Sequence, residues 1–288
     1  MRNIFTIDTE DWFHANYEEG LFRNSANVQS TVEENTEVYL KALEDNHATA
    51  TFFVLGFVAE QHPKLVKRIA DAGHEIASHG YGHQLVYKQT PEQFREDVYK
   101  SKCMLEDIIG KSVIGYRAPS WSITEDSFWA LGILNELGFQ YDSSIFPFKN
   151  FLYGVKGAPR FPFKAKQYCD AAGELVEIPP STIKFPFLNI PFSGGFYFRA
   201  LPYPFIKIFT AHVNKENYPT VFYLHPREID PKQPRLKLKR RDALIHYYGI
   251  NNCEAKVNKI LKKFNCGSIS DITGRQSPIL CKDHMWCK

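Results

Sequence analysis

No apolar run in this 288-residue sequence is long enough to cross a membrane, because a spanning helix needs about 20 consecutive apolar residues. A signal-peptide pattern is missing as well. Asp8 and Glu10 follow Met1 before any apolar stretch of sufficient length. We therefore expect a soluble protein that acts in the cytoplasm.

The sequence also has little net charge, formally +3 from 35 basic and 32 acidic residues. Nucleic-acid binding typically shows as a basic patch interleaved with aromatic residues, and no such patch is present. The cluster Lys237, Lys239, Arg240 and Arg241 is the one candidate, and it fits a solvated surface near a helix start. No nucleic-acid partner is expected.

Paired C-x-x-C motifs are absent. The six cysteines are too widely spread for a disulfide framework in a chain this long, which fits a reducing compartment. Four of them lie with His284 in the last 36 residues, where their spacings fit scattered thiols better than a structural zinc site. The cysteines are Cys103, Cys169, Cys253, Cys266, Cys281 and Cys287.

Short β-rich segments alternate with amphipathic ones over the first half of the chain. This alternation predicts parallel strands joined by crossover helices, with active groups gathered at the carboxyl ends of the strands. The expected strands cover 3–8, 48–56, 74–80, 113–120 and 139–144, and the expected helices 31–46, 62–73, 91–109 and 124–137.

Residues 146–204 are rich in Pro, Phe and Gly, which favours short strands and ordered loops at a barrel rim. The segment SGGFYFR at 193–199 is predicted as a substrate-facing loop or as a tight turn between strands. A strand at 220–226 and a helix at 253–264 then resume the earlier pattern. With no low-complexity linker, we predict one domain over 1–288, an irregular parallel α/β barrel.

Polar side chains that could do chemistry follow five of the predicted strands. Any one of them alone fits an ordinary loop residue, but their repetition at corresponding positions favours a shared site. In chain order they are Asp8, Glu10 and Asp11, then His79 and His83, Arg117, Asp142 and His225.

The segment HGYGH suggests a metal site. His79 and His83 are four residues apart, so on a helical turn they share a face and can both bind one cation. Two imidazoles and one carboxylate leave coordination positions open for water and substrate, which is a catalytic pattern. In an extended strand Glu10 shares a face with Asp8, whereas a turn or bulge would bring Asp11 to the site instead.

The order of the motifs D-T-E-D, H-x-x-x-H, R-x-P, D-S-S and L-H resembles the polysaccharide deacetylase family, the NodB-homology metal-dependent carbohydrate esterases. The resemblance covers about residues 3–228 and leaves 229–288 as a C-terminal helical extension and tail. D-T-E-D-W-F-H resembles the branch linked to exopolysaccharide and surface-polysaccharide biosynthesis. The implied fold is an irregular (β/α)7-type barrel. The implied activity is removal of an N-acetyl group from a sugar, with removal of an O-acetyl group as the second choice.

The resemblance implies a role for each motif. Asp8 would be the general base, held by Arg117. His225 would be the general acid, oriented by Asp142. The backbone N–H of Ser120 would help to stabilise the oxyanion.

The resemblance also implies one divalent metal ion, held by His79, His83 and either Glu10 or Asp11. Zinc is the first expectation, and cobalt, nickel and iron also suit this donor set.

The expected partner is an N-acetylated sugar, glycan or glycan precursor, such as a lipopolysaccharide intermediate, with Trp12 and Trp121 as candidate stacking surfaces. Two alternatives stay open. One is an amidohydrolase of the same fold acting on a small cyclic amide or ureide, and the other is a non-catalytic carbohydrate-binding protein.

Overall fold

A computed structural model describes residues 1–16, 29–150, 152–186 and 188–274. The fold is built around a curled sheet of short strands. These strands are β1 (Asn3–Thr9), β2 (Thr51–Val54), β3 (Glu75–Ser78), β4 (Gly115–Tyr116), β5 (Tyr141–Asp142), β6 (Phe163–Lys164), β7 (Val176–Glu177), β10 (Val221–Leu224) and β11 (Cys266–Gly267). Their order is β10-β1-β2-β3-β4-β5-β7-β6, with β11 paired to β1.

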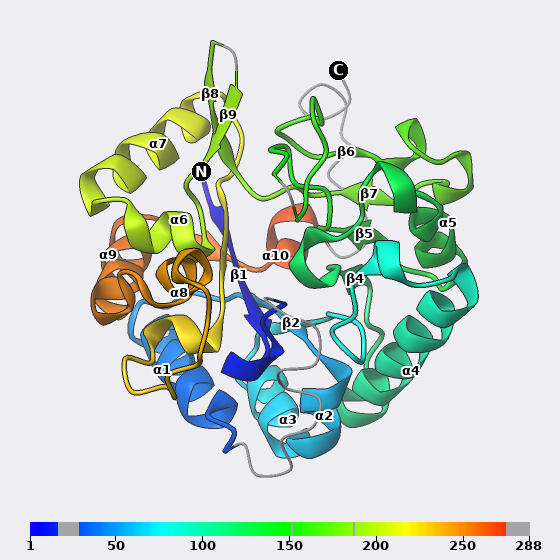
Figure 1. Ribbon diagram of the computed structural model, residues 1–288, viewed down its shortest axis with the longest axis horizontal. Helices are drawn as coiled ribbons and strands as arrows, with labels where there is room; N and C mark the ends of the chain where they lie inside the picture. Colours follow the sequence, from blue (N-terminus) through cyan, green and yellow to red (C-terminus); the bar gives the residue numbers. More distant parts are fainter. Residues whose placement is uncertain (17–28, 151, 187, 275–288) are drawn as a thin grey trace.

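Helices surround this sheet (Figure 1). Helical segments connect each successive pair of strands from β1 to β5, as parallel pairing requires. The helices are α1 (Val32–Asp45), α2 (Gly56–Gln61), α3 (Pro63–Asp71), α4 (Pro91–Ile109), α5 (Trp129–Glu136), α6 (Gly195–Ala200), α7 (Tyr203–Lys215), α8 (Arg240–Tyr247), α9 (Cys253–Lys263) and α10 (Ile269–Thr273).

β1 lies between β2 and β10, and all seven of its residues are buried. Its apolar side chains Ile4, Phe5 and Ile7 belong to the core, as expected for a parallel strand covered on both faces. The α/β class with parallel strands joined by helices is therefore confirmed.

The strand register sets several carboxyl ends at one level. Thr9 pairs with Val54, Val54 with Ser78, and Ser78 with Tyr116. The residues that follow β1, β3 and β4 therefore emerge beside one another at the same edge of the sheet.

Within the described residues, no ladder joins β10 to β6, so the barrel is open. β6 also runs antiparallel to β7. The irregular barrel predicted from the sequence takes the form of a curled sheet that does not close.

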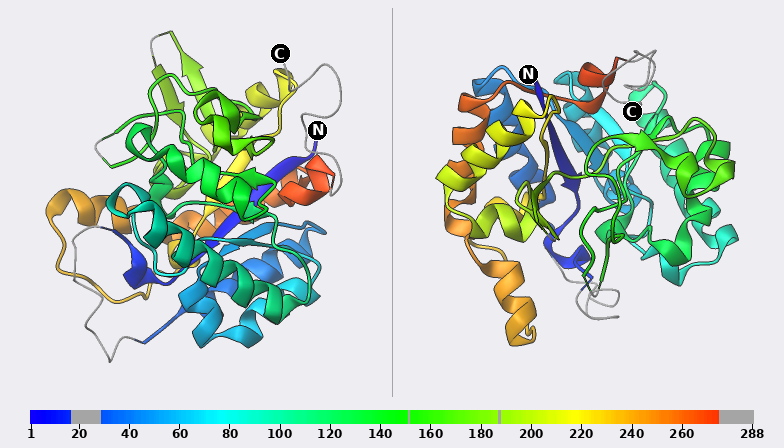
Figure 2. Two further views of the ribbon diagram at one scale, coloured as in Figure 1. Left: turned by 90° about the vertical axis from the view of Figure 1, so that its right-hand side faces the viewer. Right: turned by 90° about the horizontal axis from the view of Figure 1, so that it is seen from above.

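The Pro-rich region forms more regular structure than the sequence predicted. β8 (Thr182–Phe185) and β9 (Leu188–Pro191) make an antiparallel hairpin that projects from the fold (Figures 1 and 2). SGGFYFR is neither a loop nor a hairpin turn, since it begins α6. Gly194 is required there because a Cβ would lie 2.0 Å from the Tyr223 carbonyl oxygen. The backbone at Gly194 thus lies directly beside β10, where it forms a parallel bridge with Tyr223.

Three further features concern the cysteines, the basic cluster and the lengths of the helices. Cys103, Cys169, Cys253 and Cys266 are free thiols, whereas Cys281, His284 and Cys287 lie outside the described residues. The basic cluster at 237–241 is exposed around the start of α8. Across the described part of the chain, no helix has the length and apolar character needed to cross a bilayer. The single-domain organisation stays a prediction.

The core around β10 can be tested with one substitution. Phe222 is fully buried and its ring lies 6.1 Å from that of Phe5 and 6.3 Å from that of Phe198. We expect Phe222→Ala to lower the free energy of unfolding by about 3–5 kcal/mol, because it leaves a cavity. Urea unfolding followed by circular dichroism measures this change. The control Phe205→Ala, at a side chain 51% exposed, should change it by about 0.5 kcal/mol or less. Equal effects of the two substitutions would contradict the packing described.

Candidate active site

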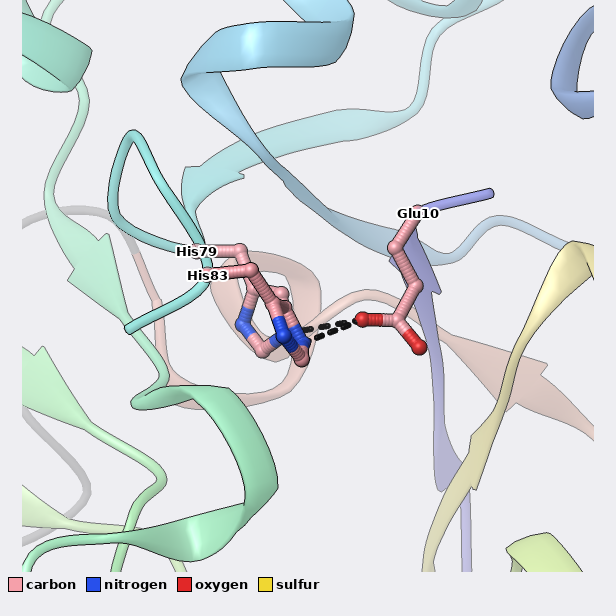
Figure 3. Close-up of side chains that lie close together, drawn as sticks. All are labelled: Glu10, His79 and His83. Carbon is pink, nitrogen blue, oxygen red and sulfur yellow. Dashed lines mark ion pairs between the residues drawn. The ribbon is translucent and has the colours of Figure 1, made fainter. Parts of the chain in front are cut away.

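Three buried side chains converge where β1 and β3 end. Glu10 follows β1, and His79 and His83 follow β3 (Figure 3). Glu10 Oε2 forms a close ion pair with His83 Nε2 and lies 3.9 Å from His79 Nε2. One donor atom from each residue lies within 4.8 Å of the others, so the three can share one metal ion.

His79 is oriented as a ligand. Its Nδ1 lies 2.8 Å from the carbonyl oxygen of Arg117, which only accepts hydrogen bonds, so Nδ1 carries the proton. The lone pair on Nε2 is then free for a cation. Burial lowers the pKa of His79 to about 4, which keeps the imidazole in the neutral form that binds metals.

The loop that carries the two histidines is not a helical turn, so the predicted reason for their proximity is wrong. Instead, the carboxylate of Asp97 on α4 accepts hydrogen bonds from the backbone N–H groups of Tyr81, at 2.6 Å, and Gly82, at 2.9 Å. Gly80 has a φ of +72°, and a Cβ there would lie 2.8 Å from the same carboxylate. A folded-back loop, held by α4, brings His83 next to His79.

Glu10 is the acid that joins the histidines. Burial raises the pKa of Glu10, but the charge and hydrogen bond of His83, with the charge of His225, outweigh burial and hold it well below its usual range. Asp11 faces away, because its carboxylate accepts from the backbone N–H groups of Trp12, at 3.1 Å, and Thr31, at 3.2 Å. Of the two predicted alternatives, the structure places Glu10 in the cluster and gives Asp11 a capping role.

A cavity of about 140 Å³ adjoins the three side chains. Of the predicted residues it is lined by Asp8, Glu10, His79, His83, Ser120, Trp121 and His225. Its wall also includes Phe196 and Tyr197, which belong to the segment 193–199 predicted to face the substrate. Asn16, Tyr153 and Tyr223 line it as well, and the sequence did not indicate them. A larger cavity of about 470 Å³ beside α8 contains none of the predicted site residues.

Arg117 lies behind the cavity and holds Asp8. Its guanidinium donates to Asp8 Oδ1 at 2.6 Å and to the Thr6 hydroxyl at 2.8 Å. It also donates to the hydroxyl of Ser143 at 2.8 Å, and it stacks over Phe53 at 4.0 Å. Because Arg117 is fully buried and its donors are occupied, it fixes the direction of the Asp8 carboxylate.

His225 completes the polar wall from the β10 side. Its Nε2 lies 3.7 Å from Asp8 Oδ2 and 3.9 Å from Glu10 Oε1. Burial lowers the pKa of His225, but its contact with Glu228 more than compensates and raises the pKa above the usual value. A protonated imidazole at this position is suited to donate a proton.

The predicted partner of His225 is wrong. Asp142 ends β5, which β1, β2, β3 and β4 separate from β10, and its carboxylate accepts from Ser143 N at 2.9 Å and from the Ser144 hydroxyl. The carboxylate next to His225 is Glu228, whose Oε2 lies 3.3 Å from Nδ1. The H-P-R-E spacing, a polar residue followed three later by Glu, was the signal that could have identified it.

Asp142 instead pairs in register with Glu177 of β7, and the two buried carboxyl groups shift each other's pKa. Burial raises the pKa of Asp142 to about 6. Burial and the neighbouring Asp142 charge raise that of Glu177 well above its usual range. Two carboxylates in contact cannot both ionise at low cost, so the pair holds a shared proton.

The two predicted tryptophans differ in position. Trp121 lines the cavity, with its ring 4.3 Å from that of Tyr223. Trp12 is 5% exposed, does not line the cavity, and donates its indole N–H to the Gln29 carbonyl at 3.2 Å. The predicted sugar-stacking role of Trp12 is therefore wrong, because the turn after Asp11 carries its ring away from the cavity.

Ser120 lies at the cavity with left-handed backbone angles, φ 52° and ψ 30°. Its hydroxyl accepts from the Asn16 side chain at 3.2 Å, and the same amide lies 3.2 Å from His83 Nδ1. The role of the Ser120 backbone N–H as an oxyanion donor stays a prediction.

Two family models match successive parts of the chain. Residues 24–141 match the polysaccharide deacetylase model, and residues 143–274 match a domain of unknown function (DUF3473). The predicted resemblance to the polysaccharide deacetylase family is confirmed over residues 24–141, and the branch linked to exopolysaccharide biosynthesis stays a prediction. His79 and His83 lie in the first matched part and His225 in the second, whereas Asp8 and Glu10 precede both matched ranges.

Similar proteins include two curated bacterial enzymes. The chain is 36% identical over 110 residues to the peptidoglycan deacetylase of Helicobacter pylori, covering 37% of this chain and 35% of that protein. It is 33% identical over 113 residues to a peptidoglycan-N-acetylglucosamine deacetylase of Bacillus cereus, covering 37% and 41%. The chain thus spans well under two thirds of either relative.

A crystal structure of a candidate polysaccharide deacetylase from Mycobacterium smegmatis superposes with a TM-score of 0.63 at 20% identity. The match covers 98% of this chain and 94% of that chain, which supports the fold assignment.

The shared proton of Asp142 and Glu177 gives a pH prediction. The pKa of Glu177 is raised in the folded protein and is about 4.3 when unfolded. The protonated Glu177 carboxyl therefore contributes its full stabilisation below about pH 4.3, and this stabilisation is lost as the pH rises through the pKa of Glu177 in the folded protein. Over that window the free energy of unfolding should fall by about 1.4 kcal/mol per pH unit, relative to Glu177→Gln, which does not titrate. Urea unfolding of both proteins from pH 5 to 8 measures the difference, and parallel curves would refute the shared proton.

Proposed function

The chain carries a polysaccharide deacetylase domain, and on that premise we propose that it is a metal-dependent hydrolase that removes an N-acetyl group from a carbohydrate. One observation carries the proposal. The cluster of Glu10, His79 and His83 adjoins a cavity that also receives Asp8 and His225. The two similar enzymes named above are both named as deacetylases of peptidoglycan, which supports a glycan substrate.

The three donors fit a divalent ion. Two imidazole nitrogens and one carboxylate oxygen form a buried set within 4.8 Å, and His79 already presents its free Nε2. Zinc is our first choice, and cobalt, nickel or iron would suit the same donors. When bound, the ion would polarise the acetyl carbonyl and make a nearby water more acidic.

Asp8 and His225 supply the proton transfers. Arg117 occupies Asp8 Oδ1, so Oδ2 is the oxygen that takes a proton from the attacking water. The water oxygen bonds to the acetyl carbon, and the C–N bond then breaks. His225 Nε2 donates a proton to the departing nitrogen, so the products are acetate and a free amine.

The cavity has room for only a small part of a glycan. At about 140 Å³ it is smaller than the roughly 300–1,000 Å³ of typical ligand pockets, so it receives the acetamido group and the adjoining part of one sugar. The rings of Trp121, Tyr153 and Tyr223 supply apolar faces that suit a pyranose. The substrate we propose is an N-acetylated sugar of a bacterial surface polysaccharide or of its precursor.

The metal can be tested by its removal. We expect chelator-treated protein to lose acetate release from N-acetylated sugars, and added zinc or cobalt to restore it. His83→Ala should lower the affinity for zinc by about tenfold or more. Elemental analysis and an enzymatic acetate assay measure both effects. Ammonia release from cyclic amides in place of acetate release would identify the other hydrolase class and refute the proposal.

The base can be tested with a matched pair of substitutions. Asp8→Asn should lower kcat about 100-fold or more, because the water loses its proton acceptor, while sugar binding by calorimetry stays close to wild type. Asp11→Asn is the control. Asp11 directly follows Glu10 in the sequence, but its carboxylate caps a turn outside the cavity. It should keep kcat near wild type. Unchanged turnover in Asp8→Asn would contradict the role of Asp8.

A further inference from the structure

Glu228 is held in one position beside His225. The two residues belong to the same turn, in which Glu228 Oε2 accepts from the His225 backbone N–H at 3.1 Å and lies 3.3 Å from His225 Nδ1. Its other oxygen, Oε1, accepts from Arg199 Nε at 2.9 Å. Glu228 is fully buried, so both of its oxygens are committed to protein partners.

Arg199 on α6 is itself fixed. It is 2% exposed, and its remaining donors bind the carbonyl oxygens of Ile245, at 2.7 Å, and Tyr248, both at the end of α8. Burial raises the pKa of Glu228, but Arg199 outweighs burial and lowers it, so the carboxylate stays charged. A fixed cation thus holds a fixed anion against the imidazole.

A carboxylate at Nδ1 determines which nitrogen of His225 serves the cavity. Because Glu228 lies on the Nδ1 side of the ring, Nε2 is the nitrogen turned toward Asp8 and Glu10, and a proton on Nε2 is the one that can reach the cavity. No other described carboxylate lies at an ion-pair distance from Nδ1.

We infer that Arg199 and Glu228 are the positioning pair for the general acid, and that Glu228 holds His225 so that Nε2 faces the nitrogen of the scissile amide. This inference rests on the proposed deacetylase function. The two residues that position His225 therefore come from the turn after β10, which carries Glu228, and from α6, which carries Arg199.

The role makes a prediction about leaving groups. An N-acetyl amide must leave as an amine, which requires a proton from His225. The ester 4-nitrophenyl acetate releases 4-nitrophenolate, which leaves without one. A defect in the acid should therefore slow the amide and spare the ester, whereas a general structural defect should slow both.

The experiment compares zinc-loaded wild type with Glu228→Gln on an N-acetylglucosamine oligomer and on 4-nitrophenyl acetate. We expect Glu228→Gln to lower kcat on the amide by about 10- to 100-fold and on the ester by less than about threefold. Asp142→Asn is the control, since its carboxyl does not contact His225, and its losses on the two substrates should be equal. If Glu228→Gln does not fold, Glu228→Asp keeps the charge and should show a smaller loss with the same selectivity.

Three results would overturn the inference: equal losses on both substrates in the Glu228 variants, no loss on the amide, or amide-selective loss in Asp142→Asn alone. A wild-type protein that releases no acetate from N-acetylated sugars would remove the proposed function itself. That result is distinct, because it appears before any variant is compared.

Discussion

Parallel pairing of neighbouring strands is the constraint on which the site depends. Because β10, β1, β2 and β3 run in one direction, their carboxyl ends meet at one edge of the sheet. Ile7 pairs with Leu224, so Asp8 and His225 emerge together, and the row from Thr9 through Ser78 to Tyr116 does the same for Glu10, His79 and Arg117. The acidic residues after β1 therefore lie beside the histidines and the arginine that follow the neighbouring strands.

Burying this much charge requires partners. Arg117 pairs with Asp8, and Arg199 pairs with Glu228, in both cases with almost no exposure to solvent. Such pairs contribute little net stability, since desolvation offsets their attraction. Their role here is to fix the positions of side chains. Arg117 holds Asp8, the proposed base, and Arg199 holds Glu228, which lies against His225, the proposed acid. The two halves of the chain that match different family models each supply one of these arginines.

Much of the fold could be predicted from local patterns, whereas partner identities could not. Apolar runs indicated β1, β2 and β10. The two histidines after one strand indicated the candidate metal ligands, although a folded-back loop and not a helical turn brings them together. The assignment of Asp142 to His225 failed because the order of strands across a sheet is not written in any local segment. Trp12 and Asp11 were uncertain for a similar reason, since the direction of a side chain after a strand depends on the turn that follows. Glu228 was accessible in principle, since it lies three residues after His225.

The central claim is that Glu10, His79 and His83 bind one divalent ion at this edge of the sheet. Diffraction from crystals of the zinc-loaded protein, collected on both sides of the zinc absorption edge, tests it most directly. The account predicts one strong anomalous peak bounded by the carboxylate and the two imidazoles. A peak ligated by other residues, or no peak at full zinc occupancy in solution, would contradict it.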